Sequence, residues 1–179
     1  MKPVRILAIL LLMCIIFSGC KNRKEEQKPG LKFPQISSSQ VGTAPADVTF
    51  SYFGASMTLP PEFSDYSHTP LGEQYDFLYS SSFLGIYGTF VEKSSVEEIT
   101  SVQQFAQDYA AQQQGEAVQK DGIWSLQYDD LTKNEPHTNL CAFYETQDNY
   151  WVITAYCPSQ SFEHYNQDMW YYVSSATFE

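Results

Sequence analysis

The sequence predicts an α+β fold in which helices cover both faces of an antiparallel β-sheet. Most stretches after residue 47 alternate apolar and polar residues, which is typical of β-strands. Two stretches, 100–115 and 162–173, instead repeat apolar residues with the period of an α-helix. The strands expected within 140–157 are apolar on both faces, as in a sheet that is covered on both sides. These three observations define the expected fold class.

The first half of the domain is expected to consist of strand pairs. Residues 48–59 predict an opening β-hairpin that ends at Pro60, and residues 62–73 predict a loop. Residues 75–79 alternate again, and a longer strand is expected at 83–91.

A helix and a further hairpin follow. Thr100 and Gln103 fit a capping box at the start of the helix, and Gly115 fits its end. Asp121-Gly122 is a strong signal for a two-residue turn between two short strands.

The last third of the chain predicts a hairpin, a helix and an edge strand. A polar loop is expected at 129–138, followed by strands at 140–145 and 150–157, a helix at 162–173 and an edge strand at 176–178. One face of the hairpin is expected to carry Phe143, Trp151 and Ile153, and the other Leu140, Ala142, Val152 and Tyr156.

The N-terminus has the layout of a secretory signal peptide. A basic start precedes an uncharged apolar stretch at 6–17, which is too short for a membrane-spanning helix of ~20 residues. Ser18 and Gly19 directly before Cys20 resemble the lipobox of bacterial lipoproteins, although Phe17 stands where that family prefers Leu. The resemblance implies that a diacylglyceryl group is attached to Cys20 and that the chain is cut before it. An ordinary signal peptide with an incidental cysteine is the alternative.

The expected organisation is a signal peptide, a tether and one domain. Cleavage would remove residues 1–19, and residues 20–46, which are rich in Pro and Ser and lack periodicity, predict a flexible tether behind the lipidated Cys20. Residues 47–179 predict a single domain. The expected location is the extracytoplasmic face of the cell membrane, held by the lipid anchor.

The charge distribution restricts the ligands of this domain. Residues 46–179 contain three lysines, no arginine and nineteen Asp and Glu, a formal charge of −16. Nucleic-acid binding requires Lys and Arg to neutralise phosphates, so we expect no nucleic-acid partner. The domain also lacks the guanidinium group of arginine, which binds carboxylate and phosphate ligands best. Cations, neutral sugars, peptides and protein surfaces remain.

The order of elements resembles the PsbP-like α/β/α sandwich over residues 47–179. The resemblance rests on the strand-pair, helix, strand-pair, helix order, on Phe50-Ser51-Tyr52 with Met57-Thr58-Leu59-Pro60, and on Gly85-Ile86-Tyr87-Gly88. Small bacterial lipoproteins of unknown function are similar to it too. The resemblance implies a partner or assembly factor of a larger complex rather than an enzyme.

Two cysteines lie in the domain, Cys141 and Cys157. Pairing about a turn at 148–149 is expected to place both on one sheet face, where either a disulfide or two packed thiols would satisfy them.

Two weak ligand sites are suggested by composition. Aromatic residues that could form a stacking platform for a sugar or peptide are Trp124, Tyr128, Trp151, Trp170 and Tyr171. A loop carries four oxygen-bearing side chains that suit Ca²⁺, namely Asp129, Asp130, Asn134 and Glu135, although a solvated acidic loop is the simpler interpretation.

No catalytic pattern is recognised in the sequence, and no cofactor is expected. The histidines at 68, 137 and 164 lack the spacing of a metal site, and a GxSxG motif is absent. We therefore expect a lipid-anchored, non-catalytic binding or assembly module for an envelope protein complex. A module for a sugar, a peptide or Ca²⁺ is the alternative, and a hydrolase of envelope polymers comes third.

Overall fold

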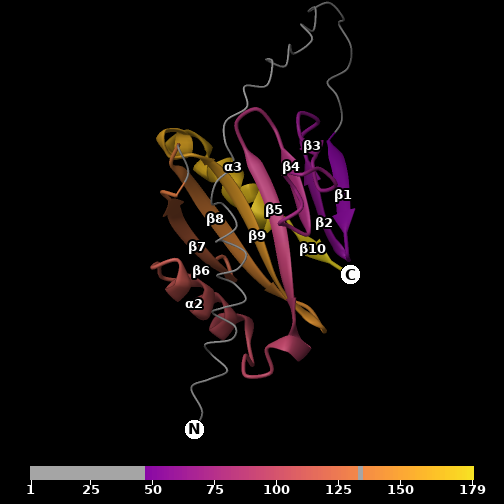
Figure 1. The fold of residues 1–179 in the computed structure, drawn as a ribbon, viewed down its shortest axis with the longest axis vertical. Coiled ribbons are helices and arrows are strands. Elements are labelled where there is room, and N and C mark those ends of the chain that lie inside the picture. Colours follow the sequence, from indigo (N-terminus) through magenta and orange to yellow (C-terminus); the bar gives the residue numbers. More distant parts are fainter. Residues whose placement is uncertain (1–46, 133–134) are drawn as a thin grey trace, which may run out of the picture. The chain divides into compact units, whose positions relative to one another are not determined.

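The computed structural model describes residues 47–132 and 135–179, and within them it contains two antiparallel sheets and two α-helices (Figure 1). The strands are β1 (Val48–Tyr52), β2 (Ala55–Leu59), β3 (Ser64–Asp65), β4 (Phe77–Ser80), β5 (Gly85–Glu92), β6 (Val118–Lys120), β7 (Ile123–Asp130), β8 (His137–Glu145), β9 (Asn149–Pro158) and β10 (Thr177–Phe178). The helices are α2 (Val102–Gln112) and α3 (Phe162–Ser174), and short 3₁₀ turns occupy Lys93–Ser95 and Ser159–Ser161. The predicted α+β class is confirmed.

The larger sheet has the order β3-β4-β5-β9-β8-β7-β6, and every neighbouring pair in it is antiparallel. The expected opening hairpin is present but belongs to a second, three-stranded sheet of order β1-β2-β10. In that sheet the short C-terminal strand β10 pairs with β2, so the last strand of the chain joins the opening hairpin (Figure 1).

Helix α2 covers one face of the larger sheet. Its buried residues Phe105, Ala106 and Ala110 pack against apolar side chains of β7, β8 and β9. The helix begins one residue later than the sequence suggested, because Ser101 is the N-cap and its side chain accepts a hydrogen bond from the Gln104 amide at 3.2 Å. The expected pairing of Thr100 with Gln103 is therefore wrong by one position.

Helix α3 and the small sheet together cover the opposite face. Met169 and Val173 of α3 pack with Leu59 of β2 and with Trp151 and Ile153 of β9. This larger core includes most of the buried aromatic residues. The expectation that both faces of the sheet are covered is confirmed, and the opening hairpin contributes to the cover beside α3.

The register of β8 and β9 corrects the expected faces of this hairpin. Its turn is centred one residue earlier than predicted, with Glu145 opposite Tyr150 and Cys141 opposite Thr154. Phe143 therefore lies with Val152 in the core beneath α2, whereas Ala142 lies with Trp151 in the core beneath α3.

The same register separates the two cysteines. Cys141 lies in the core beneath α2 and Cys157 in the core beneath α3, and both are buried free thiols. Cys141 lies opposite Thr154, which is three residues before Cys157 on β9. Because successive side chains alternate between the faces of a sheet, Cys141 and Cys157 lie on opposite faces. The shared face expected for them is wrong, and of the two alternatives the structure shows packed thiols and no disulfide.

Candidate functional site

A recess lined by tyrosines lies on the part of the larger sheet that is next to α2. It has a volume of about 330 Å³. Helix α2 packs mainly on β7 and β8, so the face formed by β4, β5 and the end of β9 is covered by the segment 66–75 instead. The residues that line this tyrosine recess are Tyr66, Leu71, Gln74, Tyr75, Leu78, Ser80 and Tyr156.

Ring contacts fix the orientation of the tyrosines in and behind the recess. Tyr75 is stacked on Tyr87 with ring centroids 4.1 Å apart, and Tyr87 is tilted against Tyr156 at 5.9 Å. The Tyr156 ring also lies 5.8 Å from the His137 ring. A Cβ at Gly85 would lie 2.1 Å from the Tyr156 ring, so glycine is required there for Tyr156 to lie against the sheet. The aromatic rings are therefore held by the protein before any ligand binds.

The hydroxyl groups of Tyr75, Tyr87, Tyr128 and Tyr156 stay protonated at physiological pH. Burial, with smaller contributions from Tyr156 and Asp130, raises the pKa of Tyr75 to about 12. Burial also raises the pKa of Tyr156, and it raises the pKa values of Tyr87 and Tyr128 behind it well above the ordinary value. A neutral phenol is a hydrogen-bond donor and acceptor, not a general base. The recess is thus equipped for binding.

A second feature is the β1–β2 turn, Tyr52–Ala55, which presents an exposed aromatic ring. Phe53 is 72% exposed, although it is apolar. Its ring lies 4.8 Å from the Tyr52 ring and 5.8 Å from the Phe90 ring, measured between ring centroids. Phe90 in turn lies 4.9 Å from the buried Trp151. Phe53 is therefore the exposed end of a chain of aromatic contacts that leads into the core.

The backbone of this turn is unfavourable for phenylalanine. Phe53 has φ 45° and Gly54 has φ 80°, the pattern of a type I′ hairpin turn in which both central residues are left-handed. The β6–β7 turn has the same pattern with Asp121 and Gly122, the residue types that such turns prefer. A bulky residue in the left-handed region is uncommon, and a strained, exposed apolar residue is a reason to look for a function.

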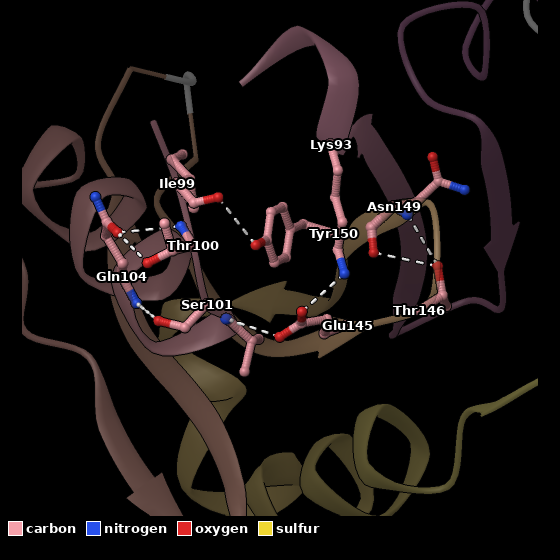
Figure 2. Close-up of polar contacts among 10 residues, drawn as sticks. Lys93, Ile99, Thr100, Ser101, Gln104, Glu145, Thr146, Asn149 and Tyr150 are labelled. Atoms are coloured by element: carbon pink, nitrogen blue, oxygen red, sulfur yellow. Dashed lines mark hydrogen bonds and ion pairs between the residues drawn. The ribbon is translucent and has the colours of Figure 1, made fainter. Parts of the chain in front are cut away.

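Polar contacts around Glu145 fix the start of α2 to the β8–β9 hairpin (Figure 2). The Glu145 carboxylate accepts hydrogen bonds from Lys93 Nζ at 2.7 Å and from the Val102 amide at 3.1 Å. The Tyr150 hydroxyl donates to the Ile99 carbonyl at 3.2 Å. The Lys93 contact, with a smaller contribution from the Val102 amide, lowers the pKa of Glu145. These contacts position the helix, so they explain its stability and not a reaction.

The expected stacking platform is not assembled. Trp151 is 1% exposed and belongs to the core beneath α3, whereas Trp124 and Tyr128 pack in the core beneath α2. Trp170 donates a hydrogen bond to Asp121 at 3.2 Å, and Tyr171 projects outward with 65% exposure. These side chains lie on two faces of the sheet and share no common surface, so the platform hypothesis is wrong in its composition.

The four oxygen-bearing residues suggested for Ca²⁺ bond to protein groups where they are described. Asp129 accepts from the Thr138 hydroxyl at 2.6 Å, and Asp130 accepts from the Thr132 amide at 3.0 Å. Glu135 accepts from Gln160 at 3.3 Å. Among the described residues, no three His, Cys, Asp or Glu side chains are grouped as metal ligands, and Asn134 lies outside those residues.

Neither Phe53 nor the recess tyrosines were singled out from the sequence. The sequence signal for Phe53 is the Phe53-Gly54 pair, at a turn position where Asn-Gly or Asp-Gly is usual. The tyrosine recess brings together residues 66, 75 and 156, which no local sequence pattern relates to each other. Cys20, the expected lipidation site, lies outside the described residues.

Comparison with known proteins supports the fold. Neither a protein-family model nor a curated protein matches the chain. The solution structure of cyanobacterial PsbP (CyanoP) from Synechocystis is similar with a TM-score of 0.55 and 13% identity, covering 82% of this chain and 100% of CyanoP. The chain therefore has a PsbP-like fold.

Two further solved structures are similar at a lower level. A crystal structure of a Bacteroides thetaiotaomicron protein has a TM-score of 0.48 and 10% identity, over 70% of this chain and 45% of that one. A mutant of the protein Mog1 has a TM-score of 0.45 and 13% identity, over 70% of this chain and 85% of that one. Within residues 47–132 and 135–179, no helix is long and apolar enough to cross a membrane.

Proposed function

We propose that this chain is a non-catalytic binding or assembly module for an envelope protein complex, and that the partner docks on the β1–β2 turn. The observation that carries the proposal is Phe53, an apolar ring that is 72% exposed in a backbone conformation unfavourable for it. Aromatic side chains that fill a partner's pocket often provide most of the binding energy of an interface. A ring held in place by Tyr52 and Phe90 loses little conformational entropy on docking.

The surface charge specifies the chemistry of the partner. The described residues carry nineteen Asp and Glu and two lysines. Both lysines are already engaged, Lys93 with Glu145 at 2.7 Å and Lys120 over the Trp170 ring at 4.3 Å. A partner that is steered by this acidic surface carries basic residues around an apolar pocket.

The anchor completes the proposal. Lipidation of Cys20 would hold the module at the extracytoplasmic face of the cell membrane, where two or three acyl chains give a stable attachment at about 0.8 kcal/mol per buried CH₂. The PsbP-like fold supports the binding or assembly role, and not the anchor, because the resemblance implies a protein that serves a larger complex.

Site-specific photocrosslinking in cells tests the docking surface. A benzophenone amino acid replaces Phe53 in the full-length chain, which is irradiated in cells, purified and analysed by mass spectrometry. The matched control carries the same group at Phe83, which is 66% exposed. Phe83 lies in the β4–β5 turn, before the start of β5, whereas Phe53 contacts Phe90 near the end of that strand.

The expected result is one dominant envelope-protein adduct from position 53 that is absent from position 83. Recovery of the uncrosslinked chain from position 53, or of the same mixture of proteins from both positions, would refute docking at the β1–β2 turn.

A further inference from the structure

The tyrosine recess shares no residue with the β1–β2 turn. Its volume of about 330 Å³ falls at the small end of the range of small-molecule pockets, which is roughly 300–1,000 Å³. None of the seven lining side chains is charged. Four of them carry a hydroxyl group, one carries an amide and two are leucines.

The polar groups of the recess retain unused hydrogen-bonding capacity. The side-chain hydroxyls of Tyr66 and Tyr75 and the amide of Gln74 form no hydrogen bond with any described residue. No buried side-chain N or O atom of the described residues lacks a hydrogen-bond partner, so these groups reach solvent. A tyrosine hydroxyl can donate and accept a hydrogen bond, and the amide supplies two further donors and an acceptor.

The tyrosine rings and the polar groups of the recess are complementary to a ligand that combines an apolar ring face with several hydroxyl groups. Tyr75 has one face fixed against Tyr87, and Tyr156 lies against Gly85. Rings held in this way can stack on a flat apolar surface with little loss of side-chain entropy. A carboxylate or phosphate ligand would find no cation among the described side chains that line the recess, and Asp130 lies close enough to Tyr75 to affect its pKa.

We propose that the tyrosine recess binds a neutral saccharide residue. The apolar face of the sugar stacks on Tyr75 and Tyr156. The sugar hydroxyl groups exchange hydrogen bonds with Tyr66 and Gln74 at the rim and with the Tyr75 hydroxyl within. This site is separate from the β1–β2 turn and does not depend on protein docking there.

Saturation-transfer NMR tests the proposal with the full-length chain in a detergent that contains no sugar. The probes are neutral disaccharides of glucose, galactose, mannose, xylose and N-acetylglucosamine, and a proline-rich peptide is the competing ligand. Tyr75→Phe removes one hydroxyl and keeps the stacked ring. Gln74→Ala removes the exposed amide. Tyr171→Phe, at an exposed tyrosine outside the recess, is the matched control.

We expect at least one disaccharide to receive saturation, most strongly at the protons of one ring face. Loss of a single hydrogen bond should weaken its affinity about fivefold in Tyr75→Phe and in Gln74→Ala, with no change in Tyr171→Phe. The proposal is overturned if no disaccharide receives saturation or if only the peptide does. It is also overturned if the affinity is unchanged in both recess variants.

Discussion

Replacing Phe53 by Asn should leave the stability of the domain nearly unchanged, although it removes a large aromatic side chain. Two opposing terms decide this. A non-glycine residue in the left-handed region costs about 1–2 kcal/mol, and Asn tolerates that region better than Phe, so the exchange recovers about 1 kcal/mol.

The lost packing is of similar size. Since Phe53 is 72% exposed, only roughly 60 Å² of an aromatic side chain of about 200 Å² is covered, which corresponds to about 1.5 kcal/mol. The net change in the free energy of unfolding should therefore stay within about 1 kcal/mol. A buried phenylalanine such as Phe77, which is 1% exposed, should instead cost about 3–5 kcal/mol when replaced by Ala.

Urea unfolding followed by tryptophan fluorescence measures both variants against the wild type. Phe77→Ala shows that the assay detects a lost core contact. A loss of about 3 kcal/mol or more in Phe53→Asn would mean that this ring stabilises the fold as a core residue does, and the reason for assigning it to a partner would disappear.

Three further outcomes follow from the structure and the sequence. Glu145→Gln should lose about 1 kcal/mol at neutral pH, because a carboxylate that caps α2 and binds Lys93 becomes neutral. The folded-state pKa of Glu145 is lowered, so its contribution is present above the ordinary glutamate pKa and is lost as pH falls through the folded value. Urea titrations should show a smaller difference between wild type and variant at pH 3 than at pH 7, and an equal difference at both would contradict the assignment. Gly88→Ala places a Cβ 2.3 Å from the Phe77 ring and should destabilise the domain by about 1–3 kcal/mol in the same assay, whereas an unchanged midpoint would show that this ring can move. Cys20→Ala should abolish palmitate labelling in cells and release the chain from the membrane fraction, and retained labelling would place the lipid elsewhere.

Much of the fold could be predicted because its signals are local. The Asp121-Gly122 turn has the expected two-residue form, and the amphipathic pattern of the C-terminal helix matches α3. Small errors arose where neighbouring residues offer the same signal twice. Thr100-Ser101 precedes Gln103-Gln104, so two capping registers are available, and the Ser101 register is the one that forms.

The register of a long hairpin could not be derived from its composition. Strands β8 and β9 are apolar on both faces, so no alternation shows which residue lies opposite which. A shift of the turn changes the partners of Cys141 and Cys157 and moves Phe143 to the other core. Sequence reasoning therefore predicted the covered sheet correctly but placed the cysteines incorrectly.

The candidate sites depend on contacts that are distant in sequence. The recess needs Tyr66, Tyr75 and Tyr156 from separate segments, and glycine at 85 to seat one of them. The importance of Phe53 appears only once its φ and its exposure are known. Abundant aromatic residues indicated that a surface of this kind exists, but they could not indicate which rings the core would absorb.

The most direct test of the proposed module is co-purification from native membranes. Wild-type chain and Phe53→Asn are expressed at equal levels, solubilised and purified through the same tag, and the recovered proteins are quantified by mass spectrometry. Our account predicts one partner in stoichiometric amount with the wild type and its loss with Phe53→Asn, while both chains remain folded and anchored. Recovery of the wild-type chain alone, or equal recovery of the partner with both chains, would contradict it.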